Sequence, residues 1–336
     1  MDNYKQQVFS LTDRSYLNIL KKDILKIGQK VELSPKKLAE LDLIVSEIAT
    51  NLLKHAGGGE IIVRPLIDPN NRGVELLSID KGPGMTDPAK MIEDGVSTTN
   101  TLGHGLGSIK RLSDQFQLYS VKGWGTVLLS RIFQQPPVSF PVSKIGVYPI
   151  VLNKPGETVC GDAYAFKFNP YFVKVMLADG LGHGPLANQA SEKACEVFRK
   201  STFNNPSDII NDIHKQVKDT RGLVATAAVY DIVNKNWKIC GVGNISTRLC
   251  NAITSKTHMP YNGIVGMNIS SRLESQTIQN ETGGYMVFCS DGISTRWETS
   301  KHPSVFKYDL SILAAIIYKD FARHSDDMSV VVVKVN

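Results

Sequence analysis

The sequence lacks the features that mark exported, membrane-spanning or nucleic-acid-binding proteins. No apolar run approaches the roughly 18 residues of a membrane-spanning helix, and the N-terminus has no apolar segment of the kind found in export signals. The 38 basic and 32 acidic residues give a net charge of +6, and this small excess is spread over both halves. We therefore expect a cytoplasmic protein that binds neither nucleic acid nor a membrane through a basic face.

Cysteine is scarce and shows no pairing pattern. The five cysteines are an odd number, all lie in the second half, and no two form a CxxC pair. Most stand in apolar surroundings, which predicts buried, reduced thiols rather than disulfide bonds.

The chain is long enough for two domains. It has 336 residues, against roughly 150 for a typical domain. Its 42% hydrophobic and 21% charged residues are ordinary for a globular protein. The stretch over residues 134–143 is rich in proline and is typical of an extended connector. We therefore expect one domain over residues 1–133 and a second over residues 144–336.

Both halves mix helices and strands, but in different orders. In the first half the patterns predict helices over 13–30, 35–55 and 106–113, and strands over 60–66, 74–79, 116–121 and 125–133. In the second half they predict helices over 185–200, 206–220 and 310–323, and strands over 145–152, 163–168, 172–177, 223–230, 237–242, 246–250, 285–289 and 328–335. The fold class is therefore α/β (α+β), with a sandwich in the second half.

A first candidate site begins on the helix predicted over 35–55. Glu47, Asn51 and His55 recur every fourth residue and share one face, separate from the apolar stripe of that helix. A carboxylate can accept a proton from an attacking hydroxyl, and an amide oxygen one turn away can ligate Mg²⁺. On the helix alone, a solvated polar face explains the same spacing.

Two later segments strengthen the functional interpretation. Asp80 ends a predicted strand and is followed by Gly82 and Gly84, so a nucleotide base could approach its carboxylate closely. A strand-end turn is the simpler explanation of this segment by itself. Further on, Gly103, Gly105 and Gly107 precede a predicted helix, where exposed backbone N–H groups can bind phosphate.

Together, ExxxN on a helix, DxGxG after a strand and GxGxG before a helix resemble the GHKL, or Bergerat-fold, ATP-binding family. The compact form of the domain is similar to the serine kinases that act on anti-sigma-factor and stressosome pathways. The resemblance implies an α/β sandwich that binds ATP with Mg²⁺. It implies Glu47 as the general base, Asn51 as the Mg²⁺ ligand and Asp80 as the adenine contact. The pocket would be shaped by Gly82, Gly84, Gly103, Gly105, Gly107 and Thr126.

A second candidate site consists of aspartates at strand ends in the second half: Asp162, Asp179, Asp291 and Asp326. Each Asp-Gly pair alone is more simply a turn. If the four carboxylates converge at one edge of a sandwich, they repel each other unless cations neutralise them. Two divalent ions there would activate a water molecule and stabilise phosphoryl charge.

The segments GD, ADGLGHG, SDGI and DDMS resemble, in that order, the PPM family of serine/threonine phosphatases in its SpoIIE-like branch. The resemblance implies an α/β/β/α sandwich with two Mn²⁺ or Mg²⁺ ions held by those four aspartates and the carbonyl of Gly180. Either Asp326 or its neighbour Asp327 would be the fourth carboxylate ligand. His183 would shape the loop rather than bind metal.

These resemblances lead to the hypothesis of a bifunctional switch. An ATP-dependent serine/threonine kinase and a metal-dependent phosphatase would act on a STAS-domain partner, in a sigma-factor or stressosome pathway. In an alternative reading, the first domain only binds ATP and docks the partner, and the phosphatase is the sole activity. A DNA-associated ATPase is a third reading, which the charge distribution does not favour.

Overall fold

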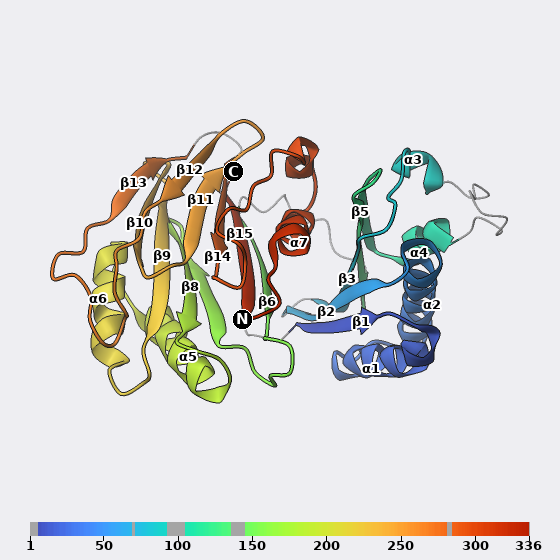
Figure 1. Cartoon of the computed structure of the whole chain (residues 1–336), viewed down its shortest axis with the longest axis horizontal. Coiled ribbons are helices and arrows are strands. Elements are labelled where there is room, and N and C mark those ends of the chain that lie inside the picture. Colours follow the sequence, from blue (N-terminus) through green and yellow to red (C-terminus); the bar gives the residue numbers. More distant parts are fainter. Residues whose placement is uncertain (1–5, 69–70, 93–104, 136–144, 281–283, 336) are drawn as a thin grey trace. The chain divides into compact units, whose positions relative to one another are not determined.

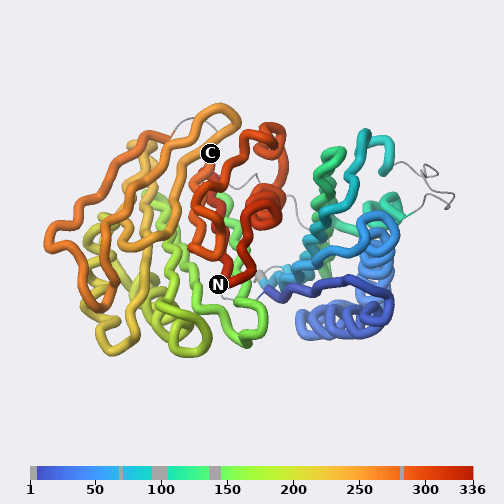
Figure 2. Tube along the Cα trace, viewed as in Figure 1, coloured from blue at the N-terminus to red at the C-terminus, as the bar shows by residue number. Residues whose placement is uncertain are grey.

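The computed structural model describes residues 6–68, 71–92, 105–135, 145–280 and 284–335. The chain forms two compact units, Met1–Val142 and Ser143–Asn336, which Figures 1 and 2 show in sequence colours. Most of the connector expected over residues 134–143 lies outside the described residues. No helix in the described part of the chain combines the length and apolarity needed to cross a membrane.

The first unit is one antiparallel sheet with helices packed on one face. The strand order is β1-β2-β3-β5-β4. The strands are β1 Gln7–Leu11, β2 Gly59–Asp68, β3 Asn71–Asp80, β4 Gln115–Val121 and β5 Gly125–Phe133. The helices are α1 Leu17–Lys30, α2 Pro35–Asn51, α3 Pro88–Met91 and α4 Gly105–Leu112.

Helix α2 follows the signals in its sequence. Ser34 caps its N-terminus by accepting a hydrogen bond from the Lys37 N–H, and Pro35 begins the helix. The apolar stripe that includes Leu41 and Ile48 is buried in the core. The α-helix ends at Asn51 and continues as a π-helical turn, Leu52–Ala56. The polar face that carries Glu47 and Asn51 therefore ends at a backbone irregularity of a kind often found at functional sites.

The second unit has four layers. Helices α5 and α6 cover a sheet of order β13-β10-β9-β8-β7; a second sheet of order β12-β11-β14-β15-β6 follows, and α7 packs on β6 and β15 (Figure 1). The helices are α5 Pro185–Lys200, α6 Pro206–Gln216 and α7 Leu310–Phe321. The strands are β6 Ile145–Leu152, β7 Asp162–Phe168, β8 Phe172–Gly180, β9 Leu223–Asp231, β10 Asn236–Val242, β11 Ser246–Cys250, β12 Ser255–His258, β13 Gln276–Gln279, β14 Tyr285–Cys289 and β15 Met328–Val335.

Two hydrophobic cores hold these layers together. One lies between the sheet β13-β10-β9-β8-β7 and the helices α5 and α6, where alanines and Phe198 of α5 pack near isoleucines of α6. The other lies between the two sheets and includes Trp237, Phe288 and Val331. The predicted fold class, an α/β domain followed by an α/β/β/α sandwich, is confirmed by this arrangement.

Several short elements were absent from the sequence-based prediction. Strands β1, β12 and β13 lie at sheet edges, and the last two have the mostly polar sequences SKTH and QTIQ. An edge strand packs less apolar surface than a central strand, so its hydrophobic signal is weak. All five cysteines are free; Cys160 is half-buried and the other four are buried, as the sequence predicted.

Candidate active sites

In the first unit, α2 and the start of α4 bring together part of the predicted ATP site. Glu47 and Asn51 are half-buried and lie one turn apart on α2. A Cβ atom on Gly105, the first residue of α4, would lie 3.0 Å from Glu47 Oε2 and 3.5 Å from Asn51 Oδ1. The absence of a side chain at Gly105 therefore leaves the space that these two polar groups face.

Asp80 is held in a fixed orientation at the end of β3. It is paired in register with Thr126 of β5, and its Oδ1 accepts hydrogen bonds from the N–H groups of Gly82 (2.8 Å) and Thr126 (3.2 Å). Gly82 lies so close to Ala56 that a Cβ atom would be 2.8 Å from it. Two predicted residues, Gly82 and Thr126, thus orient a third.

The glycine loop after Asp80 is packed against the β4–β5 hairpin. Gly84 has φ +64°, and a Cβ atom there would lie 2.0 Å from the carbonyl oxygen of Val121. The Thr126 hydroxyl lies 3.0 Å from that of Ser120, which also accepts from the Met85 N–H at 2.9 Å. Ser120 was not predicted, because one serine in a strand carries no signal in the sequence.

Two predicted glycines contribute differently. Gly107 is buried on α4. Gly103 lies outside the described residues.

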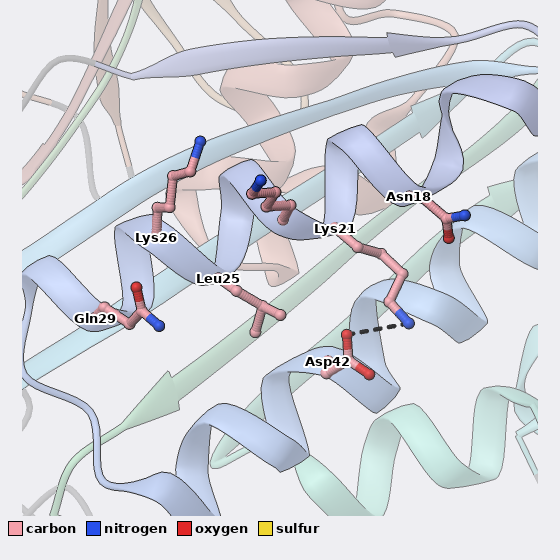
Figure 3. A pocket seen from close by; sticks show the side chains of 7 residues that line it. Asn18, Lys21, Leu25, Lys26, Gln29 and Asp42 are labelled. Carbon is pink, nitrogen blue, oxygen red and sulfur yellow. Dashed lines mark ion pairs between the residues drawn. The ribbon is translucent and has the colours of Figure 1, made fainter.

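A pocket on α1 is lined by Asn18, Lys21, Leu25 and their neighbours together with Asp42 of α2, which pairs with Lys21 at 3.1 Å (Figure 3). The residues lining this pocket include none of the predicted ATP-site residues.

In the second unit, two predicted metal ligands face each other across neighbouring strands. Asp162 begins β7 and Asp179 lies near the end of β8, and the two residues are direct partners in the antiparallel pair. Like charges in directly opposite positions destabilise a sheet. Asp162 is buried, and its Oδ2 accepts a hydrogen bond from the Ser329 hydroxyl at 2.6 Å. Its Oδ1 is buried with no hydrogen-bond partner among the described residues.

The electrostatics of this pair reflect burial and mutual repulsion. The pKa of Asp162 is raised to about 7: burial raises it most, the hydrogen bonds from Ser329 and Ser290 lower it, and the charges of Asp327 and Asp291 raise it. The pKa of Asp179 is also raised, first by burial and then by its carboxylate neighbours Asp162, Asp291, Asp326 and Asp327. A cation at this position would relieve both costs.

The remaining acidic residues are held by hydrogen bonds from the backbone and from Asn244. Asp291 Oδ2 accepts from the Asn244 amide at 2.9 Å. Asp327 is buried, and its two oxygens accept from the N–H groups of Lys154 and Gly161, each at 2.8 Å. Asp326 is half-buried and accepts from the Asp327 N–H at 2.9 Å. Asp327 therefore links its loop to the backbone at Lys154 and Gly161 through both of its oxygens. Asp326 uses one oxygen for the bond from the Asp327 N–H, which leaves its other oxygen available to a ligand.

The donor set suits divalent cations. As the side chains stand, no three acidic, histidine or cysteine residues within the described ranges converge as a complete metal site. The buried Asp162 Oδ1 without a partner, opposite Asp179, is nevertheless a position that a cation fits. Gly180 follows Asp179 and lies close to α5, since a Cβ atom there would be 2.1 Å from the Ala187 carbonyl oxygen.

Other residues at this edge support the predicted ligands. His183 Nδ1 lies 2.6 Å from Glu157 Oε1, so the predicted loop-shaping histidine is anchored by a carboxylate from before β7. Glu157 lies five residues before Asp162 and Ser329 belongs to the DDMS segment, so both are close to predicted ligands along the chain. Asn244 is 47 residues from Asp291, and only the folded structure brings these two together.

Comparison with protein families gives two matches. Residues 13–131 match the histidine kinase-like ATPase domain, and residues 171–336 match the stage II sporulation protein E (SpoIIE) family. Each match falls within one of the two compact units.

Individual relatives agree with these matches. The serine/threonine-protein kinase RsbT of Bacillus subtilis (strain 168) is 42% identical over 88 residues, 26% of this chain and 66% of the kinase. The phosphoserine phosphatase RsbX of the same organism is 25% identical over 144 residues, 43% of this chain and 72% of the phosphatase. The chain thus spans about two thirds of the kinase's length.

Two solved structures share the fold. One, from work on the bacterial stressosome as a modular system, has a TM-score of 0.52 and 27% identity and covers 56% of this chain and 98% of its own. A crystal structure of RsbX with magnesium has a TM-score of 0.51 and 22% identity, over 57% of this chain and 96% of its own. The chain therefore contains, over residues 13–131, a histidine kinase-like ATPase domain of the GHKL type and, over residues 171–336, a SpoIIE domain of the PPM phosphatase fold.

Proposed function

We propose that the protein is a bifunctional switch that phosphorylates and dephosphorylates serine or threonine on a STAS-domain partner. The observation that carries the proposal is the pairing within one chain of a kinase-like ATP site and a buried carboxylate pair suited to divalent metal. The relatives named above support it, because one is a serine/threonine kinase and another a phosphoserine phosphatase. We place this activity in the cytoplasm, without a nucleic-acid or membrane partner.

In the first unit, the chain's residues position ATP and accept a proton. Asp80, oriented by Gly82 and Thr126, accepts a hydrogen bond from the adenine amino group. Asn51 would hold the Mg²⁺ that accompanies ATP, and we assign Gly84, Gly105 and Gly107 to the nucleotide pocket. Gly103, which the resemblance adds to this set, lies outside the described residues. Glu47, one turn from Asn51, accepts the proton of the partner's hydroxyl.

In the second unit, Asp162, Asp179, Asp291, Asp326 and the Gly180 carbonyl hold two Mn²⁺ or Mg²⁺ ions. When bound, such ions supply an activated water and offset phosphoryl charge. Asp179 pairs in register with Asp162 and is surrounded by the charges of Asp291, Asp326 and Asp327, so it would be central to holding the ions. Asn244 orients Asp291, and Asp327 fixes the loop that presents Asp326.

The direct test is transfer of labelled phosphate to candidate STAS-domain proteins. An Asp179→Asn variant should block removal, so label from ATP should accumulate on the partner when Mg²⁺ is present. The Glu47→Ala, Asp179→Asn double variant should bind ATP and transfer none. ATP binding without transfer by the Asp179→Asn variant would show that the first unit is only a docking module. Separately, phosphorylated partner should be hydrolysed with Mn²⁺ and not with EDTA.

A further inference from the structure

Arg221 lies directly beside the loop that follows the predicted metal ligands Asp179 and Gly180. Gly180 of β8 pairs with Leu223 of β9, and the Leu181 N–H donates to the Gly222 carbonyl at 3.1 Å. This ladder continues the register so that Arg221 stands next to Gly182. Arg221 therefore belongs to the same edge of the sheet as the carboxylates.

The guanidinium of Arg221 is held flat against Gly182. Its Nη2, Cζ and Nη1 atoms lie 3.2, 3.3 and 3.3 Å from the position that a Cβ atom on Gly182 would occupy. Gly182 has φ +77°, so the backbone conformation and the guanidinium both favour glycine there. The segment that carries Arg221 is fixed in turn, because the Thr220 hydroxyl donates to the Val217 carbonyl (2.7 Å) and accepts from the Gly222 N–H (3.2 Å).

Arg221 has no counter-ion in the described part of the chain. Its side chain is exposed, and no described carboxylate pairs with it. Asp219, two residues earlier, pairs with Lys193 instead. The guanidinium thus stands beside Gly182, in the loop that directly follows Asp179 and Gly180, and no described carboxylate pairs with it. If divalent cations occupy the carboxylate cluster, an anion between them and Arg221 would complete the charge balance.

We propose that Arg221 binds the phosphate group of the phosphatase substrate, a phosphomonoester on serine or threonine. The proposal rests on the phosphatase function of the second unit. A planar guanidinium can donate two parallel hydrogen bonds to phosphate oxygens, which a lysine cannot reproduce. Arg221, at the strand end that follows Asp179, would therefore fix the orientation of the phosphate.

The test uses the full chain loaded with Mn²⁺ and p-nitrophenyl phosphate as the substrate. Arg221→Ala should raise KM, and the Ki of inorganic phosphate as an inhibitor, by about 10- to 100-fold, as expected for loss of hydrogen bonds to a charged group. Arg221→Lys should fall between this variant and the wild type. Arg199→Ala is the matched control, since Arg199 is exposed near the opposite end of α5, about 20 Å along the helix from its start; it should behave like the wild type.

The outcomes separate this proposal from the phosphatase function itself. An unchanged Ki for phosphate in Arg221→Ala, with an active wild type, would overturn the role of Arg221. If the wild type hydrolyses no phosphomonoester with Mn²⁺, the phosphatase function fails. Calorimetric titration of the Mn²⁺-loaded protein with phosphate would then still compare the Kd of phosphate between Arg221→Ala and the wild type. A higher Kd for Arg221→Ala supports the phosphate site, and an equal Kd contradicts it. Tm and Mn²⁺ affinity should not change in any variant, which excludes a structural effect.

Discussion

At the scale of single residues, the arrangement of Asp162 opposite Asp179 is costly unless a cation accompanies it. Both carboxyls are largely buried, and the pKa of each is raised. Among the residues that the structure describes, no lysine or arginine pairs with either carboxylate. Burial of two carboxylates that repel each other lowers the stability of the folded state. A divalent cation bound between such carboxylates would offset this repulsion and stabilise the fold.

The first prediction concerns pH and metal. Because the folded pKa of Asp162 is about 7, the folded state keeps a proton that the unfolded chain releases near pH 4. This contribution to stability is fully present below about pH 4 and is lost as the pH rises to about 7. In EDTA, the difference between the Tm of the wild type and the Tm of Asp162→Asn should therefore decrease as the pH is raised from 5 to 8.

Mn²⁺ should act in the opposite direction, because its ligands must be deprotonated. At about 100 times its Kd, Mn²⁺ should add about 2.7 kcal/mol, or about 5–10 °C in Tm, at pH 8 and much less at pH 5. Thermal unfolding at four pH values measures both effects. An equal Mn²⁺ increment at pH 5 and pH 8 would contradict the assignment of these carboxylates as ligands.

The second prediction concerns Glu47. Glu47→Gln keeps the shape of the side chain beside Gly105 but removes the base, so phosphate transfer should fall by about 10²–10⁴-fold. ATP affinity should stay within about threefold of the wild type. Asp80→Asn is the contrasting variant. It changes the group that accepts a hydrogen bond from the adenine amino group, so it should weaken nucleotide binding. Rates of labelled transfer and calorimetric Kd values for ATP separate the two; wild-type transfer by Glu47→Gln would rule out its role as base.

The sequence could predict the carboxylates but not their surroundings. Asp80, Asp162 and Asp179 each stand at the end of an apolar strand, so the local pattern reveals them. Asn244 and Arg221 come from separate segments and meet this edge of the sheet only through the tertiary fold. The sequence also could not distinguish Asp326 from Asp327. The two differ because backbone N–H groups of Lys154 and Gly161 bind the oxygens of Asp327, and the sequence does not show that these groups lie there.

At the scale of elements, the β4–β5 hairpin supports the predicted adenine contact. Gly125 has φ +120°, and a Cβ atom there would lie 2.2 Å from the Asp80 carbonyl oxygen. Gly123, in the same turn, has φ +80° and nothing within 4 Å of its Cβ position. These two glycines separate the effect of backbone conformation from that of close packing against Asp80.

The third prediction compares alanine at these positions. Gly123→Ala should cost about 1 kcal/mol, since only the left-handed conformation is strained. Gly125→Ala should cost about 3 kcal/mol or more and weaken ATP binding, because the Asp80 backbone must move. Urea unfolding followed by circular dichroism, with ATP titration, measures both variants. Equal losses of stability and equal ATP affinity would show that the contact with Asp80 is unimportant.

Element boundaries were predictable where local chemistry is strong. Ser34 and Pro35 fixed the start of α2, and Asp13 caps the short 3₁₀ turn before α1 by accepting from the Ser15 N–H. The helix predicted to end near Thr220 stops at Gln216, because Val217 and Thr220 form a turn instead. The edge strands β12 and β13 depend on pairing with distant partners, which local patterns do not encode.

At the scale of the whole molecule, the account depends on two opposing activities in one chain. If both units act on one partner, covalent linkage would present that partner to each of them at an effective concentration on the order of millimolar. Without regulation the pair would hydrolyse ATP in a futile cycle, so we expect the partner's state or metal supply to gate one activity. The sequence predicted the order of the two domains because each has its own set of motifs, but it does not encode their shared target.

The most direct measurement is mass spectrometry of one STAS-domain partner after incubation with two variants of the full chain. With ATP and Asp179→Asn, phosphate should accumulate on one serine or threonine of the partner. With Glu47→Ala and Mn²⁺, partner phosphorylated beforehand at that residue should lose the phosphate. If the phosphatase instead removes phosphate only from a different residue or a different protein, the two units are successive steps of a relay, and the two-way switch is contradicted.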